Sequence, residues 1–193
     1  MREKARKGIY IIPNLFTTAN MFSGFYAIIA TFNEDYFIAA IAILIATIFD
    51  NLDGKVARLT KATSRFGVEY DSLADLISFG LAPGLLAFSW ALNAYGRIGW
   101  VAAFLFVACG ALRLARFNVL VGTVDSKYFL GLPIPAAASL VATTILLDQH
   151  FLDMDKEIIR PLVILIMTYT LAFLMVSNIK YRSFKEFNLR ERK

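Results

Sequence analysis

The chain has 193 residues, of which 58% are hydrophobic and only 18% are charged. Soluble domains usually carry about 25% charged residues, so this composition argues against an ordinary soluble domain and indicates a membrane protein. The net charge of +5 at pH 7 is explained by basic loops that face anionic lipid headgroups. We therefore expect no nucleic acid partner.

Apolar stretches recur along the chain near the length that crosses a roughly 30 Å hydrocarbon core. They predict an all-α integral membrane protein with six transmembrane helices: Ile9–Thr31, Tyr36–Val56, Phe66–Leu92, Gly99–Ala115, Pro135–Leu147 and Ile158–Ser177. The fifth helix is short and could extend back through Phe129. We expect one membrane domain over residues 1–193. Its basic segment 1–8 begins either as an interfacial helix or as a solvated tail, and a basic tail covers residues 178–193.

The basic residues predict the orientation of these helices. With six spans, all Lys and Arg residues except Arg97, Lys156 and Arg160 lie on the side that holds both termini. Short loops rich in Lys and Arg stay in the cytoplasm. We therefore expect both termini, and the loop between the second and third spans, to face the cytoplasm.

That loop joins two helix ends that carry four aspartates. Asp50 and Asp53 are three residues apart, and Asp71 and Asp75 are four apart, so each pair shares a helix face. If a turn near Ala62 joins two antiparallel helices, Asp53 lies level with Asp71 and Asp50 lies level with Asp75. The sequence therefore predicts that four carboxylates converge on one small volume.

Four carboxylates at a membrane are costly without compensating positive charge. One remedy is pairing with the basic residues of the same loop, which are Lys55, Arg58, Lys61 and Arg65. In the expected register, however, Lys55 and Lys61 point away from the aspartates. The other remedy is a pair of divalent cations, which prefer oxygen ligands and which recur in displacement reactions at phosphorus. We predict the metal site.

Two glycines, Gly54 and Gly67, lie beside the aspartates. They would let a phosphate or nucleotide approach the backbone, although each could instead serve close helix packing.

The spacing Asp50-x2-Asp53-Gly54-x2-Ala57-Arg58-x8-Gly67-x3-Asp71-x3-Asp75 resembles the complete signature of the CDP-alcohol phosphotransferases, with every fixed position matched. The segments "IPNLFTTANMFSG", "DSLADLISFGLAPG", "GALRLARFNV" and "GLPIPAAA" are similar to the membrane-embedded phosphatidylserine synthases of bacteria and archaea. This resemblance runs from about Ile11 to Ala138.

The resemblance implies that the phosphatidyl group of CDP-diacylglycerol is transferred to L-serine, with release of CMP, at a site holding two Mg²⁺ or Mn²⁺ ions. The implied metal ligands are Asp50, Asp53, Asp71 and Asp75, and Asp75 would also be the general base. The implied nucleotide-binding residues are Asn14, Thr17, Asp50, Asp53, Gly54, Ala57, Arg58, Gly67 and Asp71. It further implies a homodimer in the cytoplasmic membrane, with the active site facing the cytoplasm.

The acceptor depends on residues outside the aspartate signature. Arg113, Arg116 and Asn118 follow one another at the end of the fourth span, and a guanidinium fork suits the serine carboxylate. Lys127 is a further candidate. Alternatively, the two arginines mark the membrane boundary or hold lipid phosphate.

Two other functions stay open from the sequence. The first is another enzyme of the same family, with a glycerol 3-phosphate, inositol phosphate or choline acceptor. The second is a divalent-cation transporter or channel that uses the aspartates as a binding site. The sequence also leaves open whether the lipid chains are ester-linked or ether-linked.

Overall fold

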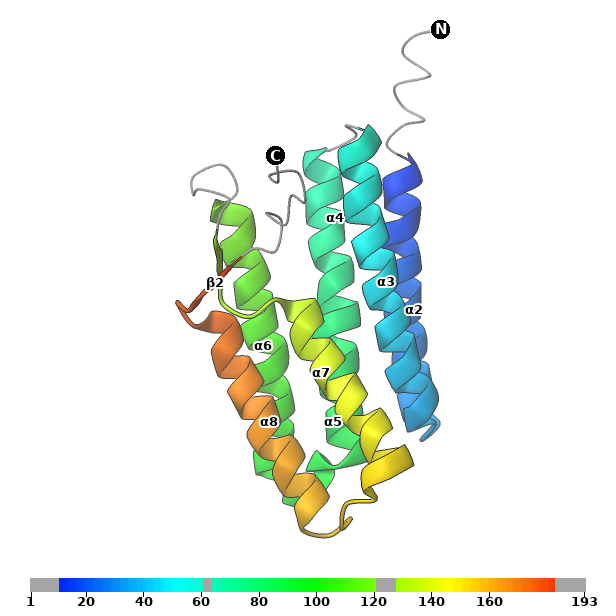
Figure 1. The fold of residues 1–193 in the computed structure, drawn as a ribbon, viewed down its shortest axis with the longest axis vertical. Coiled ribbons are helices and arrows are strands. Elements are labelled where there is room, and N and C mark those ends of the chain that lie inside the picture. The colour runs from blue at the N-terminus through cyan, green and yellow to red at the C-terminus, as the bar shows by residue number, and fades with distance from the viewer. Residues whose placement is uncertain (1–10, 61–63, 121–127, 183–193) are drawn as a thin grey trace, which may run out of the picture.

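The computed structural model describes residues 11–60, 64–120 and 128–182. Within these ranges the chain forms helices and one short antiparallel ribbon (Figure 1). The helices are α2 (Ile11–Phe32), α3 (Tyr36–Thr60), α4 (Arg65–Asp75), the π-helix η1 (Leu76–Leu81), α5 (Ala82–Trp90), the 3-10 helix η2 (Leu92–Tyr95), α6 (Arg97–Leu120), α7 (Ile134–Leu147), the π-helix η3 (Asp148–Leu152) and α8 (Ile159–Val176). In the ribbon, β1 (Tyr128–Leu130) pairs with β2 (Lys180–Arg182).

Five helical stretches are long and apolar enough to cross a membrane, which confirms a helical protein of the membrane class. They are Asn14–Phe32, Tyr36–Ala57, Arg65–Trp90, Arg97–Val119 and Ile159–Val176, and they correspond to the first four predicted spans and the sixth. The predicted segment 1–8 lies outside the described residues, as does the tail beyond residue 182.

The fifth predicted span is α7, which has only 14 residues. Its suggested extension back through Phe129 is wrong, because Tyr128–Leu130 is a β-strand and Gly131 has a positive φ of 75°. A Cβ at Gly131 would lie 2.3 Å from the carbonyl oxygen of Met175. The chain therefore turns against the end of α8 before α7 begins.

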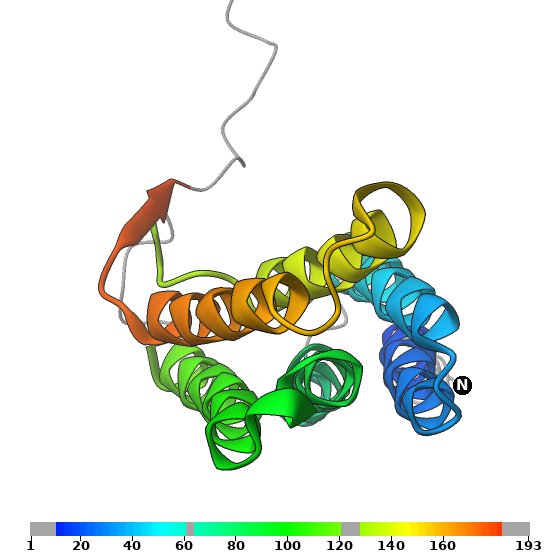
Figure 2. The ribbon, with the colours of Figure 1, turned by 90° about the horizontal axis from the view of Figure 1, so that it is seen from below.

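Two helix pairs form the sides of the bundle, and the remaining helices lie between them. Figure 2 shows α2 with α3 on one side, α6 with α8 on the other, and the α4–η1–α5 segment and α7 between these pairs. Many of the buried residues are alanines, among them Ala27, Ala39, Ala46 and Ala87. Small side chains let helix backbones approach closely in membranes, so packing brings polar residues of different helices into contact.

The third predicted span is one continuous stretch of three helical segments. In η1 the N–H of Ala82 donates to the carbonyl oxygen of Ile77, five residues back. Pro83 follows, and proline has no N–H for an α-helical hydrogen bond. The π-helix lies between the aspartates of α4 and the apolar core around α5.

A buried ion pair lies at the end of the bundle opposite the predicted aspartate site. Arg160 Nε is 2.7 Å from Asp148 Oδ2, and the Arg160 guanidinium lies 4.6 Å from the centre of the Trp90 ring. Asp148, which is 1% exposed, also accepts a hydrogen bond of 2.7 Å from the N–H of Met154. These contacts join α5, η3 and α8.

Candidate active site

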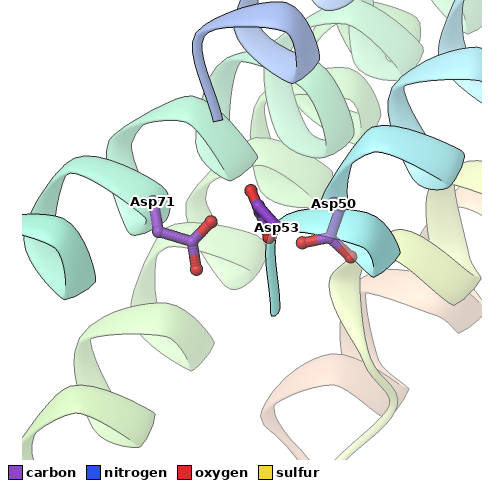
Figure 3. A group of neighbouring side chains, drawn as sticks. All are labelled: Asp50, Asp53 and Asp71. Carbon is purple, nitrogen blue, oxygen red and sulfur yellow. The ribbon is translucent and has the colours of Figure 1, made fainter. Parts of the chain in front are cut away.

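The four aspartates come from two neighbouring helices, α3 and α4. Figure 3 shows Asp50, Asp53 and Asp71 turned toward one another. One carboxylate oxygen from each of these three residues lies within 4.8 Å of the others. Asp53 and Asp75 are buried, with 5% and 7% of their surface exposed. The predicted convergence is confirmed for Asp50, Asp53 and Asp71, and Asp75 is a neighbour of this group.

The aspartates also meet in the predicted register. Asp71 is a side-chain neighbour of Asp53, and Asp75 is a side-chain neighbour of Asp50. The turn residues 61–63 lie outside the described residues, yet the two levels inferred from a turn near Ala62 agree with the helices on either side.

The first described helix, α2, supplies two hydrogen bonds to this cluster. Thr17 Oγ1 donates to Asp53 Oδ2 at 3.0 Å, and Asn20 Nδ2 donates to Asp75 Oδ1 at 3.0 Å. We expected Thr17 to contact a nucleotide. In the structure its hydroxyl donates a hydrogen bond to Asp53. Asn20 was missed in the sequence. Its position three residues after Thr17, on the same face of an apolar helix, was the available signal.

The basic residues of the loop do not neutralise the aspartates within the described part of the chain. Lys55 and Arg65 are exposed, and among the described side chains no Lys or Arg forms an ion pair with the cluster. The side chain of Arg58 and the whole of Lys61 lie outside that part. Pairing with Lys55 or Arg65 is thus not observed.

The donor set fits a hard divalent cation. Every charged group of the cluster is a carboxylate, the ligand type that Mg²⁺ and Mn²⁺ prefer. Asp71 Oδ1 is buried and has no hydrogen-bond partner among the described residues, so it has a lone pair available for a metal. Asp50, Asp53 and Asp71 could hold such an ion together.

The two glycines of the signature differ in their surroundings. A Cβ at Gly54 would meet nothing within 4 Å, so space is open beside Asp53. A Cβ at Gly67 would lie 3.2 Å from Ser64 Oγ and 3.6 Å from Asn14 Oδ1. Close packing therefore accounts for Gly67 but not for Gly54, and it places Asn14 next to the start of α4.

The remaining signature positions add little. Ala57 is partly buried in α3, and Arg58 follows it in the same helix.

The three candidates for the acceptor site are not brought together. Arg113 is 9% exposed, its Nε has no hydrogen-bond partner among the described residues, and its guanidinium lies near enough to Asp75 to feel the charge of that carboxylate. Arg116 Nη2 instead donates to Asn178 Oδ1 at 2.8 Å.

Asn118 binds the neighbouring face of α4. Its Nδ2 donates to Ser72 Oγ at 3.0 Å and to Glu69 Oε2 at 3.3 Å. Lys127 lies outside the described residues. Among the candidates in the described part of the chain, Arg113 is the one that lies near the aspartates.

Comparison with known proteins gives the family of this helical site. The family model for CDP-alcohol phosphatidyltransferase matches residues 10–178. The chain belongs to this family. The match includes all four aspartates and five helical stretches of membrane-spanning length, so the family resemblance inferred from the aspartate spacing is confirmed.

Several relatives of this CDP-alcohol phosphatidyltransferase chain have curated names. It is 46% identical over 180 residues to a CDP-diacylglycerol–serine O-phosphatidyltransferase of Helicobacter pylori, a match that covers 92% of this chain and 74% of the relative. It is 37% identical over 183 residues to an archaetidylserine synthase of Methanothermobacter thermautotrophicus, covering 94% and 73%. A CDP-diacylglycerol–serine O-phosphatidyltransferase of Methanocaldococcus jannaschii is 36% identical over 173 residues, covering 90% and 74%.

Proposed function

We propose that this chain is a CDP-diacylglycerol–serine O-phosphatidyltransferase, which makes phosphatidylserine and CMP from CDP-diacylglycerol and L-serine. The observation that carries the proposal is the carboxylate cluster of Asp50, Asp53 and Asp71, in a chain that is 46% identical to a relative of that name. The archaetidylserine synthase relative supports the same acceptor.

The aspartates have separate parts in the proposed mechanism. Asp50, Asp53 and Asp71 would hold divalent cations, with Asp75 completing a second metal position, and the bound ions would stabilise the charge that develops on the diphosphate. Asp75 takes the proton of the serine hydroxyl, because a hydroxyl is a poor nucleophile until a base removes it. The serine oxygen then bonds to the phosphorus attached to diacylglycerol, and the bond from that phosphorus to CMP breaks.

Neighbouring residues bind and orient the two substrates. The open space beside Gly54 admits the nucleotide, and Asn14, Ala57, Arg58 and Gly67 are the other proposed contacts. Arg113 binds the serine carboxylate, since its buried guanidinium lies near Asp75 and its Nε donor has no partner among the described residues. We retain Arg116 and Asn118 only as residues that hold the C-terminal end of α6 in place.

We further propose that the chain crosses the membrane six times as one domain, with both termini and the active site on the cytoplasmic side. The sixth crossing would be α7 continued by η3, which together run from Ile134 to Leu152 and would extend about 28 Å at roughly 1.5 Å per residue. The bias of Lys and Arg toward one side supports the orientation. The family resemblance supports a homodimer.

The proposal is tested with purified protein, CDP-diacylglycerol and Mg²⁺ or Mn²⁺. We expect release of CMP that requires L-serine, that stops on chelation with EDTA and that returns with either metal. Release with glycerol 3-phosphate but not with serine would point to another member of the family. Metal transport by vesicles without CMP release would favour the transporter. A parallel assay with a CDP-lipid that has ether-linked chains determines which lipid is preferred.

A further inference from the structure

Asn20 is a fully buried polar side chain in the middle of the apolar helix α2, and the proposed mechanism gives it no part. Its exposed fraction is 0%, and its Nδ2 donates to Asp75 Oδ1. Its own Oδ1 has no hydrogen-bond partner within the described residues. An unpartnered buried acceptor costs about 1–3 kcal/mol, so the stabilising contact of this side chain is the one that its NH₂ group makes with Asp75.

The contact with Asp75 has a definite chemical direction. A carboxylate oxygen only accepts hydrogen bonds, so the amide must present its NH₂ group to it. The terminal torsion of an aspartate is broad and roughly two-fold, and a fixed donor on Oδ1 selects one orientation. The donor occupies Oδ1 of Asp75, and Asp50 and Asp71 are the neighbouring charged groups of this carboxylate.

The backbone around Asn20 is held against the helix that carries Asp75. Ser78, three residues after Asp75, donates from Oγ to the carbonyl oxygen of Asn20 at 3.0 Å. One turn further along α2, a Cβ at Gly24 would lie 2.3 Å from Ser78 Oγ. These contacts fix the position of α2 against η1. The short side chain of Asn20 therefore holds its amide in a defined position next to Asp75.

We propose that Asn20 is a positioning residue for the general base. It holds Oδ1 of Asp75 and so turns Oδ2 toward the hydroxyl of the acceptor, while making no contact with either substrate. The inference rests on the proposed function, in which Asp75 removes the proton of serine. Asn20 therefore acts on the rate of the chemical step and not on the binding of substrate.

The test compares Asn20→Leu with a matched control on the same helix. Loss of the donor should lower kcat by about 10–100-fold, the range for residues that orient a reacting group. The apparent KM for serine and for CDP-diacylglycerol should stay close to the wild-type value, as should CDP-diacylglycerol binding measured without turnover. Asn20→Gln, which keeps the amide, should recover part of kcat.

The control is Ser23→Ala, one turn along α2. Ser23 is 8% exposed, and its hydroxyl donates to Ala19 of its own helix at 2.9 Å. Its removal should leave kcat unchanged.

The outcomes separate this inference from the proposed function. If the wild-type protein releases no CMP with serine, the proposed function fails. If the wild-type protein uses serine and a folded Asn20→Leu has the same kcat, only the role of Asn20 fails. A rise in KM at constant kcat also overturns it. Should Asn20→Leu not fold, Asn20→Ala, which leaves space rather than filling it, carries the same expectation.

Discussion

Buried acidic side chains lie at both ends of this bundle, and they differ in whether a basic side chain pairs with them. At one end Asp148 is matched by Arg160 and by the N–H of Met154. At the other end Asp50, Asp53, Asp71 and Asp75 converge, and the hydrogen bonds that Asp53 and Asp75 accept from α2 come from neutral side chains, Thr17 and Asn20. A buried charge without a partner is unfavourable. The first cluster therefore has the properties of a structural contact, and the second has those of a site that is completed by a ligand.

The strongest test of this contrast is Asp75→Asn. Loss of the general base should lower turnover by about 100- to 10,000-fold, whereas CDP-diacylglycerol binding should persist. The thermal midpoint of unfolding should not fall, because one of four repelling carboxylates has been removed. Turnover is measured as serine-dependent CMP release. A variant with near-normal turnover would show that another group takes the proton.

At the opposite end, Asp148→Ala and Arg160→Ala should each destabilise the fold without affecting the chemistry. Removal of one partner from a buried pair costs about 3–5 kcal/mol. Denaturant unfolding in detergent measures the loss, and kcat per folded molecule should be unchanged. The double variant Asp148→Asn with Arg160→Met should regain much of the stability. If it is as unstable as the two single losses combined, the pair is not the cause.

Arg113→Ala tests whether the aspartate end of the bundle binds serine. A hydrogen bond to a charged group is worth about 1.5–3 kcal/mol, so the apparent KM for serine should rise by about 10–100-fold. Arg116→Ala is the matched control, since that guanidinium contacts Asn178, and it should have little effect. If the KM for serine is unchanged in Arg113→Ala, Arg113 does not bind the serine carboxylate.

A smaller effect is expected from Thr17, whose hydroxyl holds Asp53. Thr17→Val keeps the shape of the side chain but loses the donor, and it should weaken Mn²⁺ binding by about tenfold. Thr17→Ser keeps the hydroxyl and should bind Mn²⁺ as the wild type does. Electron paramagnetic resonance of free Mn²⁺ gives the affinity without turnover. Equal affinity in Thr17→Val and Thr17→Ser contradicts the role.

The smallest effect belongs to the exposed basic residues near the cluster. The double variant Lys55→Ala with Arg65→Ala should change the unfolding free energy by less than about 0.5 kcal/mol, and turnover should be retained. Both quantities come from the assays above. A large loss of stability would mean that these cations neutralise the aspartates, and the contrast between the two ends of the bundle would disappear.

The sequence was sufficient to predict the aspartate cluster because helix geometry is regular. The spacings of Asp50 with Asp53 and of Asp71 with Asp75 determine a face, and a short connection determines which residues lie level. The same regularity did not reveal Asn20, because its partner is 55 residues away in sequence and only the packing of α2 on η1 brings the two together.

The sequence pattern also could not predict features that depend on the direction of a side chain or on backbone contacts between distant segments. Arg113 and Arg116 look alike at i, i+3, yet one is buried near Asp75 and the other reaches Asn178. The segment before α7 looked apolar enough to extend a helix. Pairing of Tyr128–Leu130 with Lys180–Arg182, the strand that follows α8, decided its structure instead.

The π-helix η1 changes the rotation of α4 about the helix axis relative to α5. In an unbroken α-helix each residue turns the chain by about 100°, so a regular α-helix through all of Leu76–Leu81 would rotate α4 by about that angle relative to α5. The apolar half would keep its place in the bundle while Asp71 and Asp75 swung away from α3. One extra residue in this segment thus aligns a reactive face and an anchoring face that a regular helix of this sequence would hold out of phase.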